Sequence, residues 1–249
     1  MKIACVYLTN KNSNCIFNLI NLQNHIVKYN NSNLNNITID LFIYNNNESI
    51  DDIIYNDNYC EFAYKQLQNK LNYCHWGNWY RDMYYVGQTF LVLFDLYLKY
   101  SEYNKFIFYE DDVSYIGNNN IFNLFDFNSD VIFPYTRVLN YNWVWYKYNN
   151  FGNLQLDPYS GLLNIYMLSK DIIKNIYNFI QDGNYGHFEY IVNSFIMVNY
   201  KQNNWKISYL NGNNEFKEQQ KYLNYNGSDF IHPIKSINEL KIYINKSNN

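Results

Sequence analysis

The sequence predicts an α/β fold: a single domain with a mostly parallel central sheet flanked by helices. The chain opens with a strand, a loop, a helix and a second strand, which is the usual start of a parallel sheet. Of the 249 residues, 48% are apolar and 20% are aromatic, which is enough for a sizeable core. With only 9 glycines and 3 prolines in the whole chain, no linker divides it, so we predict one domain.

The hydrophobic pattern assigns the elements in order along the chain. Residues Lys2–Leu8 have the β-branched and aromatic character of a buried strand, apolar residues from Ile16 to Val27 recur at helical spacing, and residues 37–44 return to strand character. The same criteria predict helices at 61–71, 82–100, 169–181 and 188–199, and strands at Phe106–Tyr109, Asp130–Pro134, Leu162–Met167 and, as the last one, Lys206–Leu210. We expect the strand Phe106–Tyr109, which is wholly apolar and aromatic, to lie at the centre of the sheet.

Charge and composition limit the partners and the location of the protein. The formal net charge of -3 and the pI of about 5.8 give no general attraction to nucleic acid or to an anionic membrane. No apolar run approaches the roughly 18 residues that a membrane span needs, and MKIACVYLTN lacks the apolar core of a signal peptide. The cysteines form no CxxC pair, so we expect reduced thiols. We therefore expect a cytoplasmic protein with no membrane span and no nucleic-acid partner.

Consecutive carboxylates, Glu110, Asp111 and Asp112, follow the apolar strand Phe106–Tyr109. Adjacent like charges repel and resist desolvation. Such carboxylates therefore destabilise a buried strand end unless a cationic group lies close to them. Open α/β sheets place their ligands at the carboxyl ends of strands, and carboxylates suit hard divalent cations that also bind phosphates. The position favours a site for Mn²⁺ or Mg²⁺, and a solvated, charged start of a loop is the alternative.

The segment FIFYEDDVSYIGN, residues 106–118, resembles the Asp-x-Asp region of glycosyltransferases with the GT-A fold, in a Glu-Asp-Asp form. The chain is also similar to family 2-like transferases through the ordered segments GNWYRD, NWVWY, GLLNIYMLSK, GHFEYIVNSF and IHPIKS. The resemblance implies a single GT-A-like, Rossmann-type domain over residues 1–249. Its nucleotide-sugar-binding half is expected at 1–112 and its acceptor-binding half at 113–249.

The same resemblance implies roles for the acidic residues and for two basic ones near the end of the chain. Asp112, the last acid of the motif, is expected to be the direct metal ligand, and Glu110 and Asp111 are expected to hold ribose or ordered water. His232 matches the late histidine that often completes the metal site, and Lys235 is close enough in sequence to reach a phosphate. The alternative for His232 is a turn residue before the following proline.

Glu189 is the candidate catalytic base, because it stands at the predicted start of the helix 188–199. A sugar hydroxyl is a poor nucleophile, so a transferase that inverts the anomeric centre needs a carboxylate that takes its proton. The alternative is structural, since the helix dipole favours an acid in the first turn by roughly 0.3 to 1 kcal/mol.

Two further groups of residues are candidates for binding the donor. Arg81 can brace a diphosphate and Asp82 can bind a donor hydroxyl or the base, although both also suit the start of a helix. Tyr7, Thr9 and Asn10 close the first strand, where GT-A proteins seat the nucleotide base. This second assignment follows from position alone.

The leading hypothesis is a metal-dependent, inverting glycosyltransferase that moves a sugar from a nucleotide-diphosphate sugar to an acceptor hydroxyl. A UDP-sugar is the favoured donor, and a glycan or another hydroxyl-bearing molecule is the expected acceptor. A catalytically inactive sugar-binding or scaffold protein of the same fold is the first alternative. A metal-dependent nuclease is the second, and the acidic charge balance disfavours it.

Overall fold

The computed structural model describes most of the chain. The described residues are 1–9, 16–32, 36–45, 59–60, 84–134, 136–138, 159–161, 163–182, 184, 188–210, 223–224 and 230–247. The predicted helix at 61–71 lies outside them, as do Asn10, Arg81 and Asp82.

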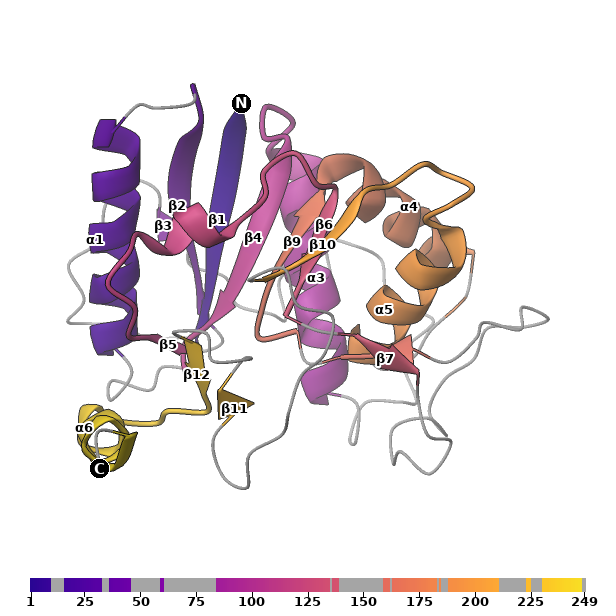
Figure 1. Ribbon diagram of the computed structural model, residues 1–249. Coiled ribbons are helices and arrows are strands. Elements are labelled where there is room, and N and C mark those ends of the chain that lie inside the picture. Colours follow the sequence, from indigo (N-terminus) through magenta and orange to yellow (C-terminus); the bar gives the residue numbers. More distant parts are fainter. Residues whose placement is uncertain are drawn as a thin grey trace.

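A seven-stranded sheet with the order β10-β6-β9-β4-β1-β2-β3 forms the centre of the molecule (Figure 1). Its strands are parallel to their neighbours except β9, which is antiparallel to both β4 and β6. The predicted α/β class with a mostly parallel sheet is therefore confirmed, and β4 takes the central position. The strands are β1 (Lys2–Thr9), β2 (Thr38–Asn45), β3 (Tyr59–Cys60), β4 (Lys105–Glu110), β6 (Val131–Phe133), β9 (Ile165–Ser169) and β10 (Ile207–Tyr209).

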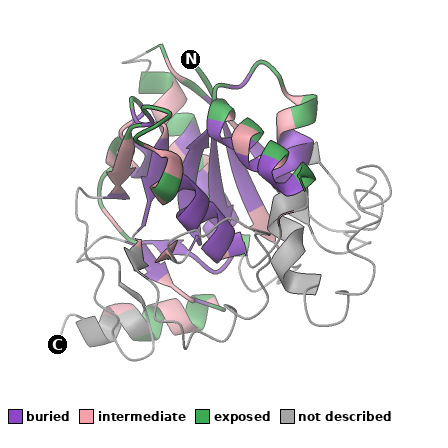
Figure 2. Ribbon diagram, turned by 90° about the vertical axis from the view of Figure 1, so that its right-hand side faces the viewer, coloured by how far each residue is buried: buried purple, intermediate pink, exposed green. Residues whose placement is uncertain are grey.

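Helices cover both faces of this sheet. Side chains alternate along each strand, so each strand places apolar residues on both faces. On β1, Ile3, Cys5 and Tyr7 pack toward α1 (Ile16–Ser32) and the short 3₁₀ helix η3 (Ile121–Leu124). The intervening Ala4 and Val6 belong to the core on the other face, beneath α3 (Tyr84–Lys99), α4 (Lys170–Gln181) and α5 (Phe188–Asn199). Figure 2 shows the buried strands between helices whose outer sides are exposed. The result is a three-layer α/β/α arrangement.

A smaller antiparallel sheet lies below the carboxyl edge of the main sheet (Figure 1). It consists of β5 (Ser114–Tyr115), β12 (Phe230–His232) and β11 (Leu223–Asn224), with β12 between the other two. The helix α6 (Ile237–Ser247) follows β12, and a separate two-stranded sheet joins β7 (Arg137–Val138) to β8 (Tyr159–Ser160). Since β5 begins two residues after Asp112, its pairing with β12 brings residues 230–232 to that edge.

Most predicted elements agree with the structure to within a few residues, and α5 has the predicted bounds 188–199. The prediction that Lys206–Leu210 is the last strand was wrong, because β11 and β12 follow it. These strands have two and three residues, which is too short for a recognisable alternation of side chains.

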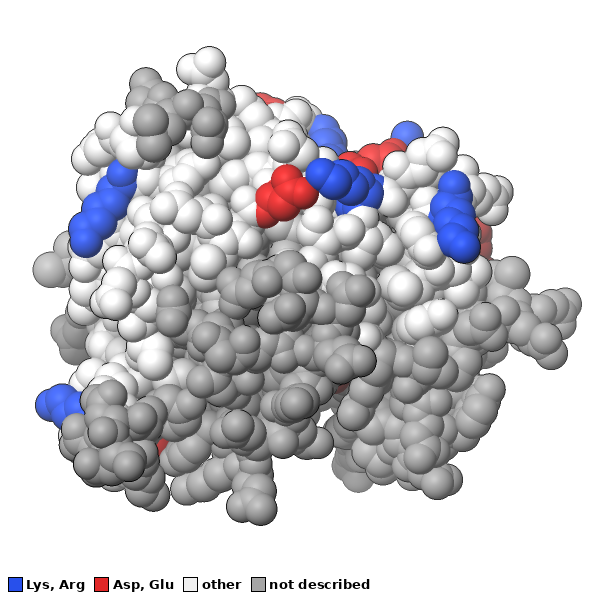
Figure 3. All heavy atoms as spheres, in the orientation of Figure 1, with Lys and Arg blue, Asp and Glu red and all other residues white. Residues whose placement is uncertain are grey.

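Charged side chains are sparse on the described part of the face seen in Figure 3, where lysines stand singly or beside acidic groups. The ion pair between Lys206 Nζ and Asp126 Oδ2, 2.9 Å apart, is an example of such a pairing in this molecule. Exposed pairs of this kind add little stability. No described helix is long and apolar enough to cross a membrane.

Candidate functional site

The acidic residues form a tight turn at the end of β4 rather than a solvated loop. The amide of Asp111 donates to the carbonyl of Leu8 over 2.9 Å, and the amide of Val113 donates to the carbonyl of Glu110 over 3.1 Å. Asp111 and Asp112 retain only 8% and 6% of their accessible surface. Burying carboxylates in this way requires compensating partners, as the sequence predicted.

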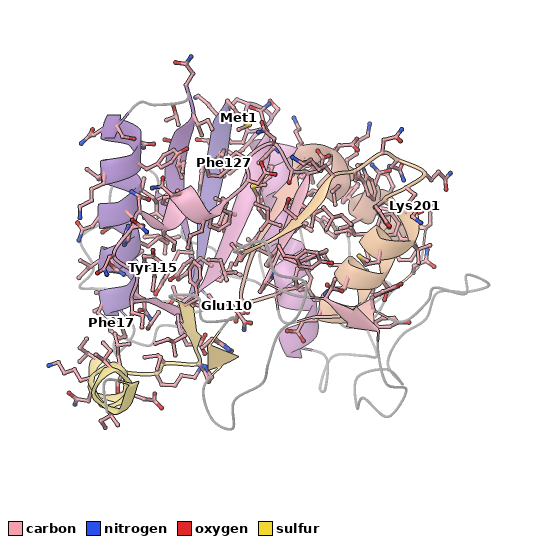
Figure 4. The ribbon with its side chains drawn as sticks, in the orientation of Figure 1. Met1, Phe17, Glu110, Tyr115, Phe127 and Lys201 are labelled. Carbon is pink, nitrogen blue, oxygen red and sulfur yellow. The ribbon has the colours of Figure 1, made fainter. Side chains whose placement is uncertain are left out.

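Glu110, Asp112 and His232 form a possible metal centre, because one ligand atom from each lies within 4.8 Å of the others. The distance from His232 Nε2 is 3.2 Å to Asp112 Oδ1 and 3.9 Å to Glu110 Oε2. Figure 4 shows Glu110 at the carboxyl edge of the sheet, beside β12. Carboxylate oxygens with one imidazole nitrogen fit a divalent cation such as Mn²⁺. His232 is the last residue of β12, so its interpretation as a turn residue was wrong.

Lys235 supplies the second basic group at this turn, and its ammonium forms an ion pair with Asp112 Oδ2. The amide of Ile234 also donates to the backbone carbonyl of Asp112 over 2.8 Å. Burial acts to raise the pKa of Asp112, but the hydrogen bonds and charges of His232 and Lys235 outweigh it and lower the pKa. Asp112 is therefore ionised at neutral pH.

Asn164 is a residue of this cluster that the sequence did not indicate. Its Nδ2 donates to Glu110 Oε2 over 3.0 Å and lies 2.9 Å from His232 Nε2. The residue is 5% exposed, and its backbone carbonyl accepts from the amide of Glu110 over 2.9 Å. Partial burial and the charge of Asp112 raise the pKa of Glu110, whose side chain is 39% exposed, although His232 and Asn164 act in the opposite direction.

Thr9 meets Asp111 at the end of the first strand. Thr9 Oγ1 donates to Asp111 Oδ2 over 2.9 Å, and Asn18 Nδ2 donates to the backbone carbonyl of Asp111 over 2.8 Å. Tyr7 is 2% exposed, its ring stacks on Tyr109, and its hydroxyl lies 3.4 Å from the carbonyl of Asp111. The first strand therefore fixes the acidic turn in place, whereas contact of Tyr7 and Thr9 with a nucleotide stays a prediction.

Glu189 lies in the first turn of α5, as predicted, and faces the segment that precedes β9. The amide of Leu163, the neighbour of Asn164, lies 3.4 Å from Glu189 Oε1 and donates to it. Burial raises the pKa of Glu189 to about 7, although the Leu163 amide lowers it. The charge of Glu189 also contributes to the raised pKa of Glu110, so the two carboxyl groups interact.

Among the residues that the structure describes, several buried polar atoms near this edge have no hydrogen-bond partner. Tyr166 Oη, Asn193 Oδ1 and His232 Nδ1 are examples. Tyr166 interacts electrostatically with Glu110, and Asn193 Nδ2 donates to the carbonyl of Glu189 over 2.5 Å. Buried polar groups in native proteins are nearly always hydrogen-bonded, to the protein itself or to ordered water.

Comparison with known proteins gives little support for a particular family. No protein-family description and no curated protein matches the sequence. The chain is similar in structure to a glycosyltransferase involved in the glycosylation of the major capsid of PBCV-1, with a TM-score of 0.39 and 8% sequence identity. The similarity covers 84% of this chain and 81% of that one. A similarity of this size identifies neither the family nor the activity.

Proposed function

We propose that the protein is a metal-dependent glycosyltransferase that moves a sugar from a nucleotide-diphosphate sugar to an acceptor hydroxyl, with inversion at the anomeric carbon. The observation that carries this proposal is the convergence of Glu110, Asp112 and His232 within 4.8 Å at the carboxyl edge of the sheet. A divalent cation held there would neutralise the diphosphate and stabilise it as a leaving group. We favour Mn²⁺ or Mg²⁺ and a UDP-sugar, in line with the resemblance of residues 106–118.

The charges of the site support a cation-dependent diphosphate site. Glu110 and Asp112 alone would repel a diphosphate, and the single ammonium of Lys235 is already paired with Asp112. We assign the nucleotide to the half formed by residues 1–112, near the turn that Thr9 holds through Asp111. Asn10, Arg81 and Asp82 remain proposed donor contacts.

We assign Glu189 as the general base on the acceptor side, in the half formed by residues 113–249. A pKa of about 7 suits this role, because a base is most effective when its pKa is near the working pH. The carboxylate of Glu189 takes the proton of the acceptor hydroxyl, and the oxygen of that hydroxyl forms a bond to the anomeric carbon. The bond from that carbon to the diphosphate breaks, and the nucleoside diphosphate leaves.

A screen of nucleotide-diphosphate sugars with Mn²⁺ tests the proposal, with release of nucleoside diphosphate as the readout. We expect release from one donor class, stimulated by an acceptor and abolished by EDTA. Binding of a nucleotide sugar with no turnover under any condition would instead identify an inactive sugar-binding protein. Cleavage of nucleic acid without any donor turnover would identify a nuclease.

A further inference from the structure

Both carboxylate oxygens of Asp112 contact basic groups. Oδ2 is paired with the ammonium of Lys235, and Oδ1 lies 3.2 Å from His232 Nε2. Asp112 is a proposed metal ligand, so the ammonium of Lys235 stands at an oxygen that a divalent cation would use. A cation and an ammonium at the same carboxylate repel each other. The ion pair therefore competes with metal binding.

Lys235, rather than Asp112, is the partner that can move. The side chain of Asp112 is 9% exposed, and its backbone carbonyl accepts from the amide of Ile234 over 2.8 Å. The side chain of Lys235 is 61% exposed, whereas its backbone amide is held by Glu239 Oε2 over 2.8 Å. Lys235 can thus withdraw its ammonium without loss of core packing, and its flexible stem keeps the ammonium near the site.

We propose that Lys235 is an internal counter-cation of Asp112, which exchanges for the divalent cation and then binds the diphosphate of the donor. This inference rests on the proposed function. The exchange of Lys235 makes the cation and the diphosphate bind cooperatively. The cation that binds alone must displace the ammonium from Asp112, whereas a bound diphosphate gives the displaced ammonium a new partner. By linkage, each ligand raises the affinity of the other by the same factor.

The proposal predicts effects of opposite sign for one substitution. In Lys235→Gln, the affinity for Mn²⁺ alone should rise by about fivefold or more, because the competing ammonium is gone. The gain in Mn²⁺ affinity caused by UDP should shrink, because no ammonium is released to bind the diphosphate. A residue that serves only to bind phosphate would leave the affinity for Mn²⁺ alone unchanged. A residue that only stabilises the fold would change neither quantity in this way.

The experiment measures free Mn²⁺ by electron paramagnetic resonance in titrations of the full chain, with and without UDP. Lys241→Gln is the matched control, because it removes one positive charge from an exposed lysine of the neighbouring α6. Asp112→Asn reports whether Mn²⁺ binds at the proposed site. Circular dichroism and melting temperature confirm that each variant is folded.

The expected result is tighter binding of Mn²⁺ alone by Lys235→Gln than by Lys241→Gln, together with weaker coupling to UDP. Equal Mn²⁺ affinity of these two variants, with loss of Mn²⁺ binding in Asp112→Asn, overturns the exchange and leaves the proposed function intact. Equal Mn²⁺ binding by wild type, Lys235→Gln and Asp112→Asn overturns both. UDP binding that needs Lys235 but not Mn²⁺ also overturns both, because the ammonium then replaces the metal.

Discussion

The side-chain amide of Asn164 donates a hydrogen bond to Glu110 Oε2 over 3.0 Å, across the antiparallel boundary between β9 and β4. The same nitrogen lies 2.9 Å from His232 Nε2. Asn164 therefore contacts two proposed ligands, Glu110 and His232, at once, and we expect it to help position them.

Replacing Asn164 should weaken metal binding. We expect Asn164→Ala to lower the affinity for Mn²⁺ by about 10- to 100-fold, the usual effect of removing a group that orients metal ligands. Asn21→Ala is a suitable control, because Asn21 Nδ2 also donates a side-chain hydrogen bond, in its case to the backbone carbonyl of Tyr115, outside the cluster. Calorimetric titration with Mn²⁺ checks the prediction, and an affinity equal to that of the control would show that Asn164 does not position the ligands.

The fold was largely predictable because its helices and strands are long enough to show their periods. The pattern gave β1 and β2 within one residue and the start of α1 at Ile16, although α1 continues past the predicted pattern to Ser32. Burial of α4 follows the predicted helical spacing at Ile172, Ile173 and Ile176. The direction of β9 is not encoded in a local pattern, because an apolar strand reads the same in either direction. The sequence therefore identified β9 as a strand but did not indicate that its amino end lies beside the carboxyl end of β4.

The site was predictable where charge or motif marked a residue, and not elsewhere. The acidic turn stood out because Glu110 and Asp112 follow an apolar strand, and the resemblance indicated His232 and Lys235. Asn164 gave no signal, since single asparagines are common in this asparagine-rich chain and its role depends on the direction of β9. The sequence placed Asn164 inside the predicted strand Leu162–Met167, whereas β9 begins one residue after it, at Ile165.

The diphosphate, rather than the nucleoside, should carry the metal-dependent part of binding. In the presence of Mn²⁺, UDP should raise the melting temperature more than UMP, because the cation is proposed to neutralise the diphosphate. A ligand at a hundredfold excess over its Kd stabilises the native state by about 2.7 kcal/mol, which a thermal-shift assay detects. Equal shifts with the two nucleotides would remove the proposed role of the acidic turn.

Substitution of Glu189 separates a catalyst from a binding protein. Glu189→Gln should keep its affinity for the donor, because the base acts on the acceptor and the amide preserves size. Transfer should fall by about 10² to 10⁴-fold, the usual contribution of a positioned base. Kd, kcat and melting temperature measured on one preparation test this. Full transfer activity would show that Glu189 is only a helix-start residue.

The raised pKa of Glu189 predicts opposite pH trends for activity and stability. Burial raises this pKa to about 7, so the ionised base forms near neutrality, and transfer should rise with pH through that range. Ionisation of a buried carboxyl costs folding free energy, so wild type should lose stability relative to Glu189→Gln as pH rises from the unfolded pKa of about 4.3 toward 7. Urea unfolding of both proteins across this range checks the sign, and a constant difference would contradict the assigned pKa.

The affinity for UDP, measured by calorimetry with Mn²⁺ and with EDTA in wild type and in Asp112→Asn, tests the central claim most directly. The amide keeps the shape of the side chain and removes the charge that holds the cation. In wild type, Mn²⁺ should raise the UDP affinity by about 5- to 150-fold, the usual range for coupled ligands, and in the variant this gain should vanish while the fold is retained. The same gain in both proteins, or equal wild-type affinity with Mn²⁺ and with EDTA, would contradict a metal-dependent diphosphate site at Asp112.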